Sequence, residues 1–323
     1  MSTATNTAQT SGRMWLRWTE VAVAVAGLLV ALWVCLTAWG AVVHGHPVYA
    51  ILLAISVVAC VLTVLLSVRR QGQPTARWRL IGRIALVLLG ASWIILIAWL
   101  RPQTAVEPAL SAMNSDAAVS VTETATEITL TPNAGGATTG VFFQPGALVD
   151  ARAYAAVLRP LAEGGHTVVI AKQPLAIAFL AAGAFDTARR SHPEVSGWVI
   201  GGHSLGGTVA AAQADAADSD AIAPAVGLFF YASYPAGDIS TSLTVPVESI
   251  SGSRDGLATP TKIEASRATL PADGQFTVID GASHAQFGAY GPQPGDNTPT
   301  ITNDDARLQI AAVTIRFVGS VSR

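Results

Sequence analysis

The stretch Trp198–Thr208 (WVIGGHSLGGT) decides the fold. An apolar run at 198–200 leads directly into GHSLG at 202–206, and a series of small residues follows. This order predicts a buried strand, a sharp turn and a helix, with Ser204 at the turn. The five-residue pattern is weak by itself, because glycine and serine are common, so its meaning depends on this setting.

The residue types around Ser204 suit a tight turn that presents a nucleophilic serine (the nucleophile turn, Gly202–Gly206). Backbone segments come so close in such a turn that side chains at Gly202 and Gly206 would collide with them. The Leu205 N–H, at the positive end of the following helix, is placed to hold a developing oxyanion. We therefore predict Ser204 as a nucleophile, the alternative being a serine that only caps the helix. We interpret its neighbour His203 as structural.

A serine nucleophile needs a base, usually histidine, and an acid. Where the serine lies in a strand–turn–helix setting, the acid follows it in the sequence and the histidine follows the acid. Asp255 lies in SGSRDGLAT after an apolar strand, and His284 lies in DGASHAQFG after the strand FTVID. Both sit past the carboxyl ends of strands, at the edge where Ser204 emerges. Asp238 and Asp280 are the alternative acids.

Strands and helices alternate over the second half of the chain. This alternation predicts an α/β fold with a mostly parallel sheet covered by helices on both faces. The predicted strands are 118–131 (one or two), 140–143, 167–170, 198–200, 226–232, 245–251 and 276–279. The predicted helices are 150–164, a stretch around 175–180, 205–217, 260–269 and 305–318.

Several ordered segments resemble bacterial α/β-hydrolase proteins, from about Gly140 to the end of the chain. They are QPGALVDARAY, IAKQPLAIAFL, GGHSLGG, GSRDGLAT and SHAQFGAYGPQPGD. The resemblance implies an α/β-hydrolase fold with the triad Ser204, Asp255 and His284. One departure is Ser283, where Asn often precedes the histidine, and it concerns the hydrogen bonding of that loop.

The second N–H donor to the oxyanion is expected from the loop that follows the predicted strand 140–143. Pro145 has no N–H, so Gly146 or Ala147 must supply it. The resemblance favours Ala147, because Pro-Gly stands here where related enzymes have His-Gly. Only about 13 residues separate the strand ending near Tyr231 from the next, too few for a helical cap, so we expect a shallow, open pocket. Three residues that follow His284 either form the rim of this pocket or pack beneath the histidine loop: Gln286, Phe287 and Tyr290.

The first hundred residues differ from the rest, in a chain that is 51% hydrophobic and 12% charged with a mean hydropathy of +0.45. Three uncharged runs are each long enough to cross about 30 Å of hydrocarbon as a helix. We predict a membrane anchor at 1–101 with transmembrane helices at about 21–43, 48–68 and 81–100, a linker at 102–117 and a hydrolase domain at 118–323. A signal peptide followed by core helices is the alternative.

Arginine placement predicts the orientation in the membrane, because cationic flanks of short loops stay in the cytoplasm. Residues 1–101 hold eight Arg against one Glu, net +7, and 102–323 are net −9. Two arginines precede the first run, and five lie between the second and third. These are Arg13 and Arg17, then Arg69, Arg70, Arg77, Arg79 and Arg83. The pattern predicts a cytoplasmic N-terminus and an extracytoplasmic domain in a multi-pass membrane protein.

An acidic domain offers no electrostatic attraction for nucleic acid. Both cysteines, Cys35 and Cys60, fall within the predicted spans. The triad chemistry requires no metal and no organic cofactor. The sequence thus predicts a membrane-tethered serine esterase or lipase-like enzyme acting on a small-molecule or lipid ester. The alternatives are an acyltransferase or peptidase that uses the same triad on envelope material, and a non-catalytic domain of a membrane assembly.

Overall fold

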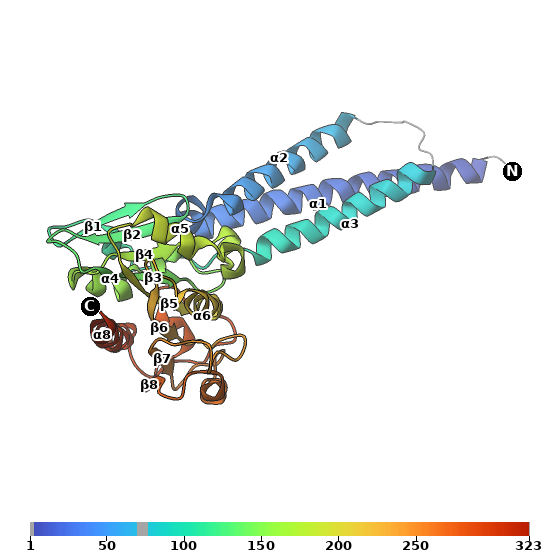
Figure 1. The fold of residues 1–323 in the computed structure, drawn as a ribbon. Coiled ribbons are helices and arrows are strands. Elements are labelled where there is room, and N and C mark those ends of the chain that lie inside the picture. Colours follow the sequence, from blue (N-terminus) through green and yellow to red (C-terminus); the bar gives the residue numbers. More distant parts are fainter. Residues whose placement is uncertain (1–2, 70–76, 323) are drawn as a thin grey trace. The chain divides into compact units, whose positions relative to one another are not determined.

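The computed structural model describes residues 3–69 and 77–322 (Figure 1). The chain divides into two compact units. One comprises Met1–Val43 and Pro47–Arg101, and the other comprises His44–His46 and Pro102–Arg323. Arg70, one of the arginines behind the predicted orientation, lies outside the described residues.

Three long helices form the first unit: α1 (Thr3–His44), α2 (Pro47–Arg69) and α3 (Arg77–Trp99). Their segments Met14–His44, Pro47–Ser67 and Trp78–Trp99 are long and apolar enough to cross a membrane. Many large apolar side chains on them are exposed, among them Leu36 at 76% and Ile95 at 70%, as surfaces facing lipid require. Three membrane-spanning helices, as predicted, are therefore consistent with their length and composition.

Glu20 is the one acid in the first 101 residues. Its carboxylate accepts hydrogen bonds from Arg83 at 2.7 and 2.9 Å, so α1 and α3 are joined by a two-pronged ion pair. A charge near lipid is costly unless it is paired, and this contact offsets that cost.

The second unit is built on one eight-stranded sheet in the order β1-β2-β4-β3-β5-β6-β7-β8. All pairs from β4 through β8 are parallel, while β1 and β2 join the edge as antiparallel strands. The strands are β1 (Val119–Glu123), β2 (Glu127–Pro132), β3 (Thr139–Gln144), β4 (Val168–Ala171), β5 (Gly197–His203), β6 (Ala225–Tyr231), β7 (Val247–Gly252) and β8 (Gln275–Ile279). The predicted α/β fold with a mostly parallel sheet is confirmed.

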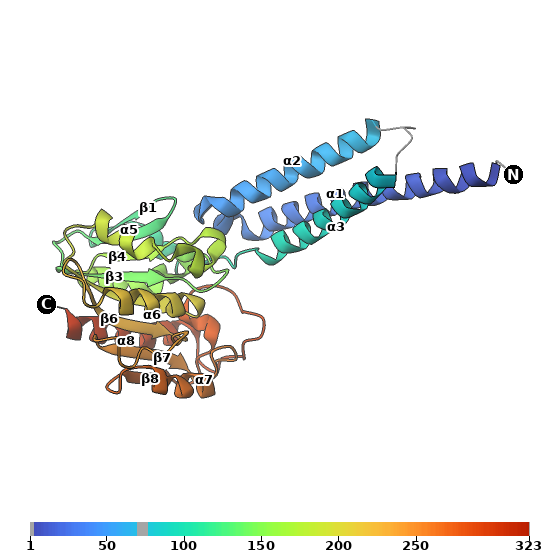
Figure 2. The same ribbon diagram turned by 45° about the vertical axis from the view of Figure 1, so that its right-hand side comes forward.

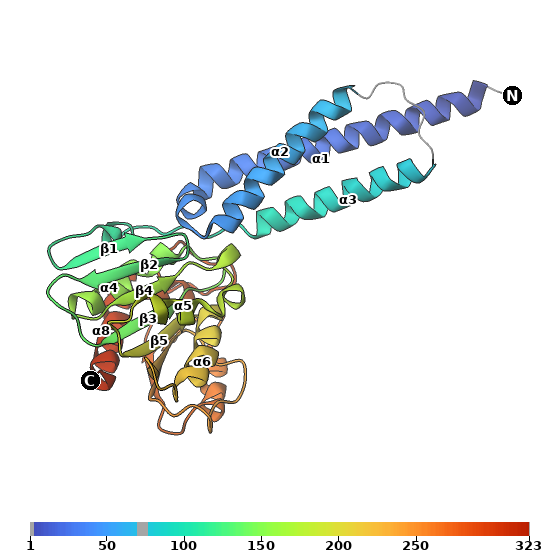
Figure 3. The ribbon, with the colours of Figure 1, turned by 45° about the horizontal axis from the view of Figure 1, so that its top comes forward.

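Helices cover both faces of this sheet (Figures 2 and 3). Alternate strand residues point to opposite faces, so Phe143 and Phe229 pack with α4 (Ala155–Glu163) and α8 (Asn303–Val321). Phe142 and Phe230 pack instead with α5 (Ala184–Ser191) and α6 (Leu205–Ala217). Coverage on both sides explains why the central strands read as continuous apolar runs rather than as alternating ones. A shorter helix, α7 (Pro260–Ala265), follows β7.

The helix predicted around 175–180 is wrong. The chain forms two 3-10 turns there, η3 (Pro174–Ala176) and η4 (Ala178–Ala181), and the regular helix α5 comes later. Leu175 and Ala176 have φ values of 56° and 53°, which no α-helix allows. Tertiary hydrogen bonds hold this shape, since Leu148 N–H donates to the Ala176 carbonyl at 2.8 Å and Gln213 donates to the Ala182 carbonyl at 2.7 Å.

The remaining short turns lie in loops. They are η1 (Ser111–Met113), η2 (Ala151–Tyr154), η5 (Ser266–Thr269) and η6 (His284–Phe287). The helix predicted from Asp150 to Gly164 is present as η2 and α4, and the Asp150 carboxylate caps its start by accepting the Arg152 N–H at 3.0 Å.

Residues 102–117, the predicted linker, group with the second unit. Gln103 N–H donates to the Leu148 carbonyl at 2.7 Å, and Val106 N–H donates to the Ala289 carbonyl at 2.9 Å. The segment therefore contacts both the loop after β3 and the loop after His284.

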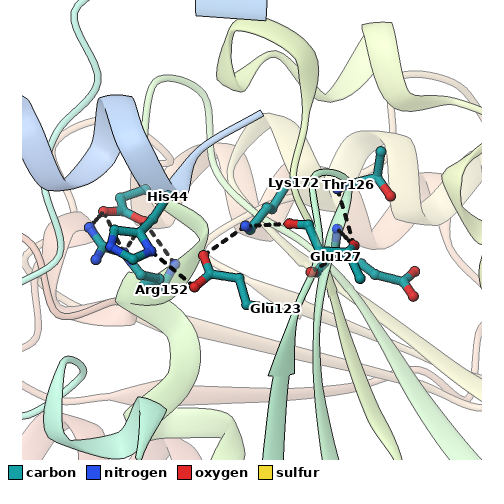
Figure 4. A network of polar contacts seen from close by, with 8 residues as sticks. His44, Glu123, Thr126, Glu127, Arg152 and Lys172 are labelled. Atoms are coloured by element: carbon teal, nitrogen blue, oxygen red, sulfur yellow. Dashed lines mark hydrogen bonds and ion pairs between the residues drawn. The ribbon is translucent and has the colours of Figure 1, made fainter. Parts of the chain in front are cut away.

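A buried cation stabilises the antiparallel edge of the sheet, just past the end of β4 (Figure 4). The Lys172 side chain is 3% exposed, and its ammonium group lies 2.7 Å from the Glu123 carboxylate. It also donates to the Thr124 carbonyl at 2.6 Å, so the end of β4 is joined to the turn between β1 and β2. A buried ammonium ion needs such partners because it has left water.

Candidate active site

Ser204 occupies the turn between β5 and α6, as its flanking sequence predicts. Its backbone has φ 50° and ψ −125°, a strained conformation for a residue with a side chain. A Cβ at Gly202 would lie 2.5 Å from the Gly206 carbonyl carbon, and one at Gly206 would lie 2.1 Å from the Gln144 oxygen. Glycine is therefore required at both positions, and the partly exposed serine stands at the carboxyl edge of the sheet.

Asp255 and His284 meet at the same edge, after β7 and β8. His284 Nδ1 lies 2.8 Å from Asp255 Oδ2, and the side chains are 1% and 0% exposed. The other oxygen, Asp255 Oδ1, accepts the N–H groups of Leu257 and Ala258 at 2.7 and 2.8 Å. A carboxylate held in this way can orient an imidazole and stabilise its protonated form.

The alternative acids make other contacts. Asp238 accepts the Ser240 N–H at 2.9 Å, and Asp280 accepts the Ser253 hydroxyl at 2.8 Å. Both are exposed, whereas the carboxylate bonded to His284 is buried.

The His284 ring lies beside the nucleophile turn. Its centroid is 4.5 Å from that of His203, the residue directly before Ser204. His284 Nε2 is buried and has no hydrogen-bond partner within the described structure, so it is not bonded to the Ser204 hydroxyl. Catalytic hydrogen bonds are often open without substrate and close only in the complex.

The profile of the Alpha/beta hydrolase family matches residues 140–308, slightly more than half of the chain. The chain belongs to this family. The matched range contains Ser204, Asp255 and His284, and the strand order of the hydrolase domain places all three at one edge of its sheet.

Solved structures of hydrolases are similar to part of this chain. The propionate-bound esterase Est2 of Thermogutta terrifontis is 15% identical, with 63% of this chain and 93% of that chain covered and a TM-score of 0.43. A dienelactone hydrolase from Anabaena variabilis is 16% identical, with 61% and 92% covered and a TM-score of 0.44. A CIB-like hydrolase from Thermoplasma acidophilum is 11% identical, with 62% and 99% covered and a TM-score of 0.48. The search of curated proteins finds no match.

The N–H groups predicted from the sequence to hold an oxyanion are those of Leu205 and Ala147. Within the described residues, neither the Leu205 N–H nor the Ala147 N–H has an acceptor. The Gly146 N–H, the other donor considered from the sequence, already donates to the Tyr154 hydroxyl at 2.9 Å. The loop after β3 thus leaves Ala147 as its free donor.

The residues suggested for a pocket rim are buried in the hydrolase domain. Gln286 is 7% exposed, Phe287 0% and Tyr290 5%. Gln286 accepts the Ser283 N–H at 3.1 Å and donates to the Ile301 carbonyl at 3.1 Å, so it holds the histidine loop from within. Their burial favours packing beneath the loop, the alternative that the sequence left open. Ser283 accordingly forms the capping box of η6 with Gln286.

Asp296 is a site residue that sequence reasoning missed. Its carboxylate accepts the Gly256 N–H at 3.0 Å and the Ala285 N–H at 2.9 Å, and these residues directly follow Asp255 and His284. Burial alone would raise the pKa of Asp296, but these N–H groups outweigh burial and hold the pKa below its usual value. The sequence did contain a pointer to Asp296, because it is the final residue of the segment SHAQFGAYGPQPGD.

No helix covers the nucleophile turn from the connection between β6 and β7, residues 232–246. The segment after β4 is apolar and partly open to solvent. Phe179 is 58% exposed and Leu180 is 54% exposed. This surface adjoins the loop of Ala147, because Leu148 N–H donates to the Ala176 carbonyl.

Proposed function

We propose that the protein is a membrane-tethered, extracytoplasmic serine hydrolase that cleaves carboxylic esters. The observation that carries this proposal is the buried His284–Asp255 pair, 2.8 Å apart, beside the strained Ser204 turn. A turn that only capped a helix would not need a buried, oriented imidazole next to it. Membership of the hydrolase family supports the same conclusion.

The reaction proceeds through an acyl-enzyme. His284 Nε2 takes the proton from the Ser204 hydroxyl, and the serine oxygen bonds to the ester carbonyl carbon. The negative charge that develops on the carbonyl oxygen is held by the Leu205 and Ala147 N–H groups. The C–O bond to the alcohol then breaks, and His284 returns the proton to the departing oxygen. Water, deprotonated by the same imidazole, releases the carboxylic acid and restores Ser204.

The substrate we propose is an ester with an apolar acyl group. Phe179 and Leu180 are exposed on the segment whose Ala176 carbonyl accepts the Leu148 N–H, and there they would shield an acyl chain from water. Each CH₂ group that such a surface buries contributes about 0.8 kcal/mol. A small-molecule ester and a lipid ester both meet this description.

Active-site labelling tests the enzyme itself. The full-length protein in detergent should react with a fluorophosphonate probe and hydrolyse p-nitrophenyl butyrate, and Ser204→Ala should abolish both. Ser219→Ala, in the exposed turn after α6, is the matched control and should leave both unchanged. Folded wild-type protein that neither labels nor hydrolyses would refute the proposal and favour the non-catalytic alternative.

Added acceptors distinguish ester hydrolysis from acyl transfer by the same triad. If the enzyme is a hydrolase, an amine or alcohol acceptor leaves the carboxylic acid as the main product. If acylated acceptor dominates at millimolar concentrations against water, the enzyme is a transferase and the hydrolytic assignment is wrong.

The proposed orientation rests on the arginine pattern, with eight of the nine charged residues of 1–101 being Arg. Both native cysteines lie in the apolar helices, so a cysteine placed on the exposed Ala272 gives a clean reporter. In intact cells, Ala272→Cys should react with a membrane-impermeant maleimide. Reaction only after cell lysis would place the domain in the cytoplasm instead.

A further inference from the structure

A chain of hydrogen bonds connects the loop after β3 (the oxyanion loop, residues 145–149) to His203, the residue before Ser204. Gly146 N–H donates to the Tyr154 hydroxyl oxygen at 2.9 Å, and that oxygen lies 2.8 Å from His203 Nδ1. Tyr154 is 0% exposed and His203 is 1% exposed. Two loops that are 57 residues apart in sequence, around Ala147 and Ser204, therefore meet through one buried hydroxyl.

The direction of each bond follows from the donors available. The tyrosine oxygen accepts the Gly146 N–H and has a single proton of its own, which it donates to His203 Nδ1. Burial raises the pKa of Tyr154, so the hydroxyl keeps this proton. Burial, with a smaller effect from the His284 charge, holds the pKa of His203 well below its usual value, so the ring stays neutral with its proton on Nε2.

Close packing leaves the loop little freedom. A Cβ at Gly146 would lie 2.6 Å from His203 Nδ1 and 3.0 Å from the Tyr154 oxygen. A Cβ at Gly206, on the other side of Ser204 in the sequence, would lie 2.1 Å from the Gln144 oxygen and 2.2 Å from the Pro145 oxygen. The loop after β3 therefore packs closely against the nucleophile turn, and the tyrosine hydroxyl is bonded to it at Gly146.

We infer that Tyr154 and His203 are positioning residues that orient the Ala147 N–H toward the oxyanion. The inference rests on the proposed function of Ser204. Fixing the Gly146 N–H on Tyr154 orients the next peptide group, whose N–H belongs to Ala147 and has no acceptor within the described residues. A neutral His203 also avoids placing a second positive charge 4.5 Å from the imidazolium that forms on His284.

The test compares two buried tyrosine hydroxyls. Tyr154→Phe removes the connecting group, and Tyr231→Phe removes an equally buried hydroxyl, bonded to Thr314 Oγ1 at 2.7 Å in the core. A misplaced oxyanion donor acts in the transition state, so we expect Tyr154→Phe to lower kcat on p-nitrophenyl butyrate by about 10- to 100-fold with KM nearly unchanged. Tyr231→Phe should leave both constants within about two-fold.

Hydrogen exchange of the full-length protein gives a second readout that needs no activity. Peptides that contain residues 144–149 should exchange faster in Tyr154→Phe and at the wild-type rate in Tyr231→Phe. Unchanged exchange, or equal kcat losses in the two variants, would overturn the inference. If wild-type protein does not turn over ester, the proposed function fails, and the exchange comparison still decides whether Tyr154 holds the loop.

Variants of His203 separate positioning from bulk packing. His203→Leu removes the acceptor and should reproduce the kcat loss of Tyr154→Phe, and the double variant should lose no more than either alone. His203→Asn returns an acceptor near the Nδ1 position and should recover most of kcat. Additive losses, or no recovery with Asn, would show that His203 acts only by filling space.

Discussion

The nucleophile turn and the histidine loop reach the same edge of the sheet by different physical means. The turn is defined by backbone sterics within a few consecutive residues, where Gly202 and Gly206 permit the strained Ser204. The acid–histidine pair is assembled from three distant segments through hydrogen bonds, with Asp296 joining the residues after Asp255 and His284. Steric constraints are visible in a short motif, whereas a hydrogen-bonded assembly is recognised only when its parts meet.

Breaking the acid–histidine pair should have the largest effect. In Asp255→Asn, the amide oxygen keeps the two backbone N–H donors, so the NH₂ group faces His284 Nδ1 and favours the wrong imidazole tautomer, whereas the flipped amide would leave both N–H groups without an acceptor. We expect kcat on p-nitrophenyl butyrate to fall by about 10⁴-fold with the fold intact. Asp280→Asn is the matched control, and a loss there as large as that of Asp255→Asn would reassign the acid.

The steric constraint at the turn can be tested at Gly206. In Gly206→Ala, the new Cβ would lie 2.1 Å from the Gln144 oxygen and 2.2 Å from the Pro145 oxygen, so the turn and the oxyanion loop must separate. We expect kcat to fall by about 10²-fold and the free energy of unfolding to fall by about 1–3 kcal/mol. Gly183→Ala, where no atom lies within 4 Å of the added carbon, should change neither. Equal behaviour of the two variants would contradict this account of the turn.

A substitution of Asp296 tests whether hydrogen bonds alone hold the loops of Asp255 and His284 together. Asp296→Asn keeps the shape but replaces one acceptor with a donor that faces an N–H group. We expect kcat to fall by about 10-fold, because His284 and Asp255 lose their common support. Asp304→Asn, whose carboxylate pairs with Arg307 on the surface, should have wild-type kinetics. Wild-type kcat in Asp296→Asn would reduce this residue to a structural role.

The pH dependence of stability gives the smallest effect. The pKa of Asp296 is lower in the folded chain than its ordinary value of 3.8, so on acidification the unfolded chain takes up this proton first. Its stabilisation is complete above about pH 4 and is lost as the pH falls toward the folded pKa. Thermal unfolding should therefore show a larger fall in Tm between pH 6 and pH 3 for wild type than for Asp296→Asn. Parallel curves would mean that the carboxylate contributes no such stability.

Much of the site was predictable because its residues follow apolar strands. Each strand reads as a buried run, and the carboxyl ends of parallel strands share one edge, so Ser204, Asp255 and His284 could be placed together from sequence. The 175–180 region was mispredicted because its apolar composition is compatible with a helix, while bonds from Leu148 and Gln213 hold its carbonyls elsewhere. Phe287 and Tyr290 were ambiguous because a residue after a catalytic loop can face either way.

The sequence by itself determined the α/β class, the three apolar helices and the nucleophile turn, since these depend on local periodicity and local sterics. Only the tertiary structure decided that Asp255 rather than Asp280 meets His284, and that the Gly146 N–H is already bonded to Tyr154. The physical reason is that a hydrogen bond depends on distances of a few tenths of an ångström between groups far apart in the chain. No pattern of residue types specifies such distances before the sheet brings the groups together.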